Sequence, residues 1–227
     1  MRGHALLLSC LGLAAATPAL AADTALGYTP AVPGTTLIFD DGTVVTAGRV
    51  QGAQAVLHSL DARYVPAEPQ CDESFALGMP VGGTYKVDGL WHEWQILYGP
   101  TLMQSLLPLQ PGRRVVFQDV PGYEDGVQSH RENWTIEAVR YETLDLPFGS
   151  YRTLYVRETD IHYEPDGTFS MDRTFEQWIA IDLGLSVRER ATYNDPPDGV
   201  VYDRTAVELT TDPARAVEAE GCGPLIY

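Results

Sequence analysis

Five Asp-Gly pairs punctuate this sequence, at positions 41–42, 88–89, 125–126, 166–167 and 198–199. Glycine adopts positive φ without strain and aspartate tolerates it better than most residues, so Asp-Gly is a preferred two-residue turn of a β-hairpin. Most of the pairs lie between short runs rich in Val, Ile, Thr, Tyr and Trp, which favour strands. The pattern predicts an all-β fold, an antiparallel meander that forms a curved half-barrel or open barrel with little helix.

Alternation and turn residues predict strands at 35–39, 43–50, 55–60, 81–87, 90–98, 113–119, 134–144, 151–157, 174–181, 185–193 and 200–210. Segment 66–80 contains three prolines and is expected to be a long surface loop, because proline donates no hydrogen bond to a sheet. Segment 100–111 is either one helical turn or a buried connector. A short helix is expected at 213–220, with Asp212 as its N-cap.

The first 22 residues have the features of a cleavable export signal. Arg2 supplies positive charge, residues 5–16 form an apolar core, and Ala19-Leu20-Ala21 matches the small-x-small cleavage pattern. The competing interpretation is a lipoprotein acylated at Cys10. No later segment has the roughly 20 continuous apolar residues of a membrane span. We therefore expect a periplasmic protein, with the extracellular space as the alternative.

Residues 23–227 are expected to form a single β-rich domain. A short internal echo links residues 33–41 to residues 111–119, which share the frame Pro-Gly-x-x-aliphatic-aliphatic-Phe-x-Asp. This echo is consistent either with two similar halves, at about 30–100 and 108–212, or with a chance recurrence of strand-forming residues.

The chain is strongly acidic, with 15 basic and 31 acidic side chains and a formal charge of −16. Such a surface repels phosphate backbones and anionic lipid headgroups. Nucleic acid is therefore excluded as an expected partner, and peripheral membrane binding is disfavoured.

Cys71 and Cys222 are the two cysteines that remain after the signal segment. An oxidising compartment can pair two cysteines, so a disulfide between them is expected. In the chain-entropy model, this bond would contribute on the order of 5 kcal/mol because it closes a long loop.

Residues 146–157 read LPFGSYRTLYVR and residues 175–190 read FEQWIAIDLGLSVRER. Together these segments resemble a pattern found in exported bacterial β half-barrel proteins of unknown function, whose shape is related to that of periplasmic lipoprotein carriers. The resemblance covers about residues 105–210. It implies a curved antiparallel sheet and says almost nothing about activity, because the matching residues are turn formers and core residues.

One candidate ligand site follows from strand alternation along residues 90–98. His92 and Trp94 are expected to share a face that is otherwise apolar. If that face lines a concave sheet, the indole offers contact area and the imidazole offers orientation to a ligand. The alternative is a core histidine that is hydrogen-bonded to backbone, which is the commoner situation.

No catalytic motif, cofactor motif or metal-ligand motif emerges. The histidines form neither HxH nor HExxH spacing, and the sequence has no GxSxG. His162 and Glu164 are expected on one strand face, where a weak cation site competes with a solvated hairpin turn, and the turn is favoured.

These observations predict an exported envelope protein that acts by binding a small amphipathic molecule or an envelope protein, and not by catalysis. The alternatives are a structural or assembly factor of the envelope and, with less support, a hydrolase. A deep apolar pocket would favour the binding module, whereas a flat exposed apolar patch would favour the assembly factor.

Overall fold

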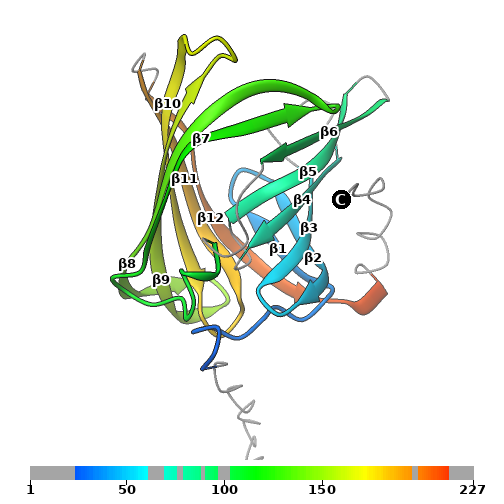
Figure 1. Cartoon of the computed structure of the whole chain (residues 1–227). Helices are drawn as coiled ribbons and strands as arrows, with labels where there is room; N and C mark the ends of the chain where they lie inside the picture. The colour runs from blue at the N-terminus through cyan, green and yellow to red at the C-terminus, as the bar shows by residue number, and fades with distance from the viewer. Residues whose placement is uncertain are drawn as a thin grey trace, which may run out of the picture.

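In the part of the chain that the structure describes, twelve antiparallel strands form one continuous sheet (Figure 1). This computed structural model describes residues 24–60, 69–75, 79–87, 90–96, 103–195 and 199–214. The strands are β1 Thr35–Phe39, β2 Val44–Gln51, β3 Gln54–Leu60, β4 Pro69–Phe75, β5 Met79–Val87, β6 Leu90–Ile96, β7 Arg114–Glu124, β8 Val127–Leu146, β9 Gly149–Tyr163, β10 Phe169–Ala180, β11 Leu185–Asp195 and β12 Gly199–Thr211. The predicted all-β antiparallel meander is confirmed.

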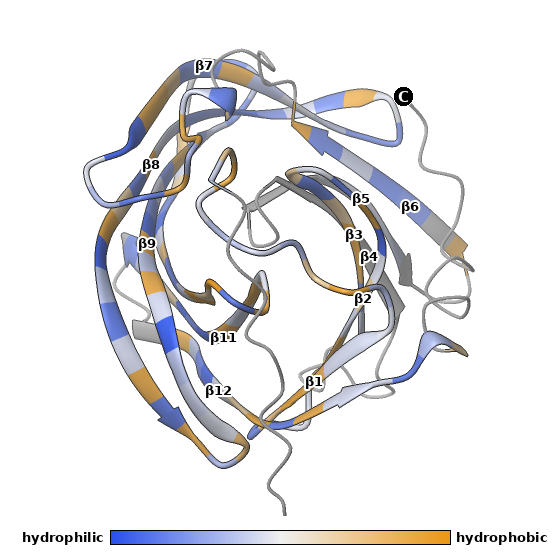
Figure 2. Cartoon of the chain, turned by 90° about the horizontal axis from the view of Figure 1, so that it is seen from below, coloured by the Kyte–Doolittle hydropathy of each residue, from blue (hydrophilic) through white to orange (hydrophobic). Residues whose placement is uncertain are grey.

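Each strand pairs with its neighbours in the sequence, and β1 also pairs with β12, so the hydrogen-bonded ladder runs all the way round. Viewed from below, the strands surround a common interior (Figure 2). The junction between β6 and β7 is short, because its described pairs involve only Trp94 to Ile96. The curved sheet therefore closes into a barrel with one narrow join.

The Asp-Gly turns are where the hairpin rule places them. Asp41-Gly42 joins β1 to β2, Asp125-Gly126 joins β7 to β8, and Asp166-Gly167 joins β9 to β10, with positive φ at each glycine. Residues 88–89 and 198 lie outside the described residues, but each falls between two strands that pair with each other.

The expected loop at 66–80 is wrong for most of its length, because β4 and the start of β5 lie there. The prolines do not prevent this arrangement. Pro69 is the first residue of its strand, and Pro80 pairs beside a register shift. First residues and irregular positions are the places in a sheet that tolerate proline.

Four strands extend well beyond the predicted ranges. β7 and β8 include residues 120–124 and 127–133, and β9 and β10 include residues 158–163 and 169–173, all outside the strands predicted at 113–119, 134–144, 151–157 and 174–181. In these extensions, charged side chains occupy positions that face the barrel interior, so the alternation of apolar and polar residues is absent. The same extensions carry the candidate site described below.

One end of the barrel is filled by apolar side chains. Segment 103–112 begins with a short helical turn and places Met103, Leu106 and Leu109 in the core, so it is both a turn and a buried connector. Tyr28 is fully buried in the same core, and the backbone N–H of Leu109 donates to Leu26 O over 2.7 Å. The opposite end, between the β7–β8 and β9–β10 turns, is polar inside.

Three sequence expectations fall wholly or partly outside the described residues. Residues 1–23, which contain the expected export signal and Cys10, are not described, and neither is Cys222. Cys71 lies in β4, opposite His58 of β3, so the disulfide stays a prediction. At the expected helix of 213–220, Asp212 Oδ1 accepts a hydrogen bond from Ala214 N over 2.9 Å, as an N-cap does.

Candidate metal centre

His92 and Trp94 lie on β6 beside the narrow join of the barrel. His92 Nδ1 is 2.9 Å from Asp125 Oδ2, and the imidazole stacks on Tyr85. Trp94 packs partly buried against the core and pairs with Glu124 of β7. The histidine thus bonds to a carboxylate in the β7–β8 turn, which is neither a backbone partner nor a ligand. The ligand role of both residues stays a prediction.

The polar end of the interior contains a cluster that the sequence analysis did not predict. His130 and Glu132 are two residues apart on β8, and Asp160 and His162 are two residues apart on β9, so each pair shares one face of its strand. Glu132 pairs with His162 in the register of the two strands. A His-x-Glu strand and an Asp-x-His strand therefore present four ionisable groups side by side.

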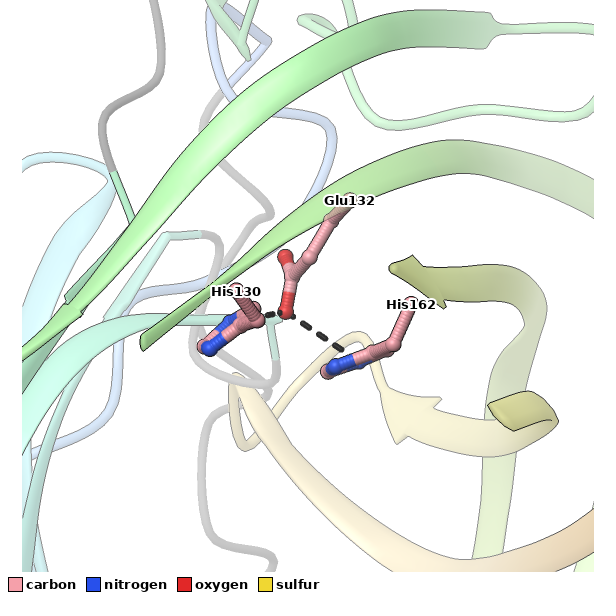
Figure 3. A group of neighbouring side chains, drawn as sticks. All are labelled: His130, Glu132 and His162. Carbon is pink, nitrogen blue, oxygen red and sulfur yellow. Dashed lines mark hydrogen bonds and ion pairs between the residues drawn. The ribbon is translucent and has the colours of Figure 1, made fainter. Parts of the chain in front are cut away.

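The side chains of His130, Glu132 and His162 converge on one point (Figure 3). Glu132 Oε1 is 2.8 Å from His130 Nε2 and 3.1 Å from His162 Nε2. The ligand atoms of all three residues lie within 4.8 Å of one another. The two imidazole rings are nearly parallel, with centroids 4.9 Å apart. One carboxylate oxygen thus receives two imidazole nitrogens.

This cluster is deeply buried. Glu132 is 1% exposed, Asp160 is 0% exposed and His162 is 6% exposed. Among the described residues, Glu132 Oε2 and Asp160 Oδ1 have no hydrogen-bond partner. A buried carboxylate oxygen without a partner costs free energy, so a ligand that contacted these two oxygens would stabilise this end of the barrel.

Arg173 of β10 provides part of the compensation. Its Nε donates to Asp160 Oδ2 over 2.7 Å, and the same oxygen is 2.6 Å from His162 Nε2. The hydrogen bond from His130 to Glu132 raises the pKa of His130, against the opposing effect of burial. This shift favours the protonated, positively charged form of the His130 imidazole.

Glu158 lies further along the same interior face of β9. Burial, followed by the charge of Asp160, raises the pKa of Glu158 to about 8. Its carboxyl group is 1% exposed, and Oε1 has no partner among the described residues. Glu158 is therefore predominantly protonated at neutral pH, which avoids one more buried negative charge.

A glycine on the neighbouring strand makes room for His130. Gly122 of β7 pairs with His130 of β8. A methyl group added at Gly122 would stand 2.1 Å from His130 Nε2, far inside van der Waals contact. The imidazole therefore reaches the cluster across a strand position that has no side chain.

The outer face of the sheet also has a hollow, in which several charged groups pair with one another. Thr135, Thr159, Thr174 and Thr192 form a row across β8 to β11 in this hollow. Beside the row, Arg157 donates to Glu137 over 3.0 Å, and Arg190 is 3.8 Å from Glu176. These pairs stabilise the sheet, and we do not assign a ligand to this face.

Side-chain chemistry decides what the interior cluster can do. Imidazole nitrogen and carboxylate oxygen are the donors that zinc and its neighbours in the first transition row use in proteins. The sequence favoured a solvated hairpin turn for His162 and Glu164. Glu164 is exposed, as that prediction expects, but His162 is buried. The sequence pattern that could have indicated this cluster is the i, i+2 spacing of His-x-Glu and Asp-x-His on two strands of one hairpin.

Within the described residues, no helix is long and apolar enough to cross a membrane. No protein-family model matches the sequence, and neither does any curated protein.

Several solved structures are similar to this chain. The hypothetical lipoprotein YmcC from Escherichia coli has 14% identity and a TM-score of 0.43 over 77% of this chain and 82% of that one. A proposed exported protein with a YmcC-like fold from Bacteroides fragilis has 13% identity and a TM-score of 0.39, over 82% of this chain and 100% of that one. A proposed lipoprotein from Parabacteroides distasonis has 12% identity and a TM-score of 0.42, over 83% of this chain and 100% of that one.

Proposed function

We propose that this chain is an exported, non-enzymatic binding protein of the bacterial envelope, and that its ligand is a small cation held at the polar end of the barrel interior. The sequence predicted a binding module for a small molecule or a protein partner. The observation that carries the narrower proposal is the buried, incompletely paired carboxylates of Glu132 and Asp160.

The charge balance of this end favours a positively charged ligand. Among the described residues, Glu132, Asp160 and Glu189 are carboxylates of the interior, and so is Glu158, which its raised pKa keeps protonated. Arg173 pairs with Asp160, and Arg204 pairs with Glu189 over 2.9 Å. Among the described residues, Glu132 contacts the two histidines through Oε1 and nothing through Oε2, so this carboxylate is the one that a bound cation would contact.

The test is thermal unfolding of the purified, untagged protein after treatment with a chelator. Zn²⁺, Ni²⁺, Mn²⁺, Ca²⁺, Mg²⁺ and spermidine are added in turn at constant ionic strength. A ligand at 100 times its Kd stabilises the folded state by about 2.7 kcal/mol. For a chain of this size, this corresponds to a rise in Tm of about 5 °C or more.

The matched controls are Glu132→Gln and Glu164→Gln, which remove one acidic charge from the interior and from the exposed β9–β10 turn, respectively. We expect the rise in Tm to disappear in Glu132→Gln and to persist in Glu164→Gln. If none of the six cations raises Tm, or if both variants respond as the parent does, the proposed function is wrong.

A further inference from the structure

We propose that the cation is a divalent transition-metal ion of the zinc type, bound by His130 Nε2, Glu132 and His162 Nε2, and that Gly122 is the residue that lets His130 reach it. This inference rests on the proposed function and narrows it from any small cation to one class of ion and one set of ligands.

The first argument is distance. Ligand atoms that lie 2.0–2.1 Å from a tetrahedral zinc ion stand about 3.3 Å apart. The two imidazole nitrogens lie 2.8 Å and 3.1 Å from Glu132 Oε1. The two nitrogens lie within 4.8 Å of each other, so two edges already match a coordination tetrahedron, and rotation of the imidazoles toward an ion would complete the third.

The second argument is the pattern of partners. His162 Nε2 lies 2.6 Å from Asp160 Oδ2 and 3.1 Å from Glu132 Oε1, and His130 Nε2 lies 2.8 Å from the same oxygen of Glu132. Oε2 of Glu132 has no partner among the described residues. Convergence of several donors on one point, with unused lone pairs beside it, is typical of a site built around an ion.

The third argument concerns the tautomer of His130. Its Nδ1 is 2.7 Å from Ser129 Oγ, so the outer nitrogen has a hydrogen-bond partner of its own. When Nδ1 donates to this hydroxyl, Nε2 has a free lone pair that points at a carboxylate oxygen. In this tautomer Nε2 is available to ligate an ion, and a ligating histidine is commonly held in this way through its other nitrogen.

The donor set selects the ion. Ca²⁺ and Mg²⁺ prefer six or more oxygen ligands, whereas imidazole suits Zn²⁺, Ni²⁺ and Cu²⁺. Two imidazoles and one carboxylate therefore favour the second group. Arg173, which bonds to Asp160 beside the site, lowers the negative charge that a hard cation would need.

Gly122 offers a test that leaves every ligand in place. In Gly122→Ala, the new methyl group would lie 2.1 Å from His130 Nε2 and 2.4 Å from Cε1 of the same ring. Both contacts are with the far end of a movable side chain, so the imidazole rotates away while the strand keeps its backbone. The variant moves one ligand atom and changes no ligand.

The experiment measures Zn²⁺ affinity and stoichiometry by calorimetry with a competing chelator, and the visible absorption of the Co²⁺-loaded protein. We expect one ion per chain. His130→Gln and His162→Gln should each weaken binding at least about 100-fold, and Gly122→Ala should weaken it about 10- to 100-fold and shift the Co²⁺ bands. His92→Gln, which changes a histidine outside the cluster, should bind as the parent does.

Circular dichroism and urea unfolding establish that each variant is folded, and Gly122→Ala remains informative if a histidine variant does not fold. If Ca²⁺ or spermidine binds while Zn²⁺ binds with unchanged affinity in both histidine variants, the inference is overturned and the proposed function stands. If no cation binds the parent protein, both fail. Unaltered Zn²⁺ affinity and Co²⁺ bands in Gly122→Ala would refute the role of the glycine.

Discussion

Glu132 of β8 and His162 of β9 face each other directly across a pair of hydrogen-bonded strands, and their side chains meet inside the barrel with 3.1 Å between Oε1 and Nε2. Strand pairing alone fixes this meeting, because directly opposed residues project to the same face of a sheet. His130 and Asp160 join from the next positions on that face. The candidate site is thus a property of strand register.

The carboxylate of Glu132 should have opposite effects on the free energy of unfolding with and without bound metal. Without metal, Glu132→Gln should leave the free energy of unfolding unchanged or raise it by about 1 kcal/mol, because an amide costs less to bury than an incompletely paired carboxylate. With saturating Zn²⁺, the parent protein should be the more stable of the two. Urea unfolding with chelator and with Zn²⁺ measures both differences. A variant that is less stable under both conditions would contradict this prediction.

Glu158 should make stability depend on pH. Its pKa is raised to about 8 in the folded state, from 4.5 for the ordinary side chain. The folded protein therefore holds a proton that the unfolded chain releases, and the stabilisation, complete below pH 4.5, is lost as pH rises to about 8. We expect Glu158→Gln to be more stable than the parent at pH 8.5 by about 2 kcal/mol or more, since one pKa unit corresponds to about 1.4 kcal/mol. Chelator-treated protein at pH 5 and pH 8.5 provides the comparison, and equal pH dependence in both proteins would disprove it.

The buried pair of Arg204 and Glu189 should show strong coupling. Arg204 Nε donates to Glu189 Oε2 over 2.9 Å, and the guanidinium lies over the rings of Phe39 and Tyr202. Arg204→Met should cost about 3–5 kcal/mol, because it leaves a buried carboxylate without its partner. Adding Glu189→Leu should recover most of that loss. A double-mutant cycle in urea measures the coupling, and additive effects would mean that the pair contributes little.

Gly34 and Gly112 form a matched pair for separating two costs of substitution. Both have φ near +88°, but a methyl group at Gly34 would lie 2.3 Å from Asp212 O, whereas nothing lies within 4 Å at Gly112. Gly112→Ala should cost about 1 kcal/mol for the left-handed backbone alone. Gly34→Ala should cost more, because β1 must also move away from the end of β12. If thermal or urea unfolding showed equal losses of stability in the two variants, the contact with Asp212 would add no measurable cost.

Much of the fold could be predicted from the sequence. The Asp-Gly turns and the alternating apolar runs predicted the meander, because two-residue turns and period-two burial are local properties. The extensions of β7 to β10 could not be found in this way. Their interior positions hold residues such as His130, Glu132, Glu158 and Asp160, and local pattern assigns charged residues to solvent. The prolines of segment 66–80 wrongly predicted a loop for a similar reason, because only the pairing with β3 shows that Pro69 begins a strand.

The sequence by itself determined the all-β class, the hairpin order and the acidic character of this protein. Only the tertiary structure decided that the barrel has an apolar end and a polar end, and that His130, Glu132 and His162 share one point within the polar end. The physical reason is that turn formation and alternation depend on neighbours along the chain. A cluster of imidazoles and carboxylates depends on the register between strands and on closure of the sheet, which places charged side chains inside rather than in water.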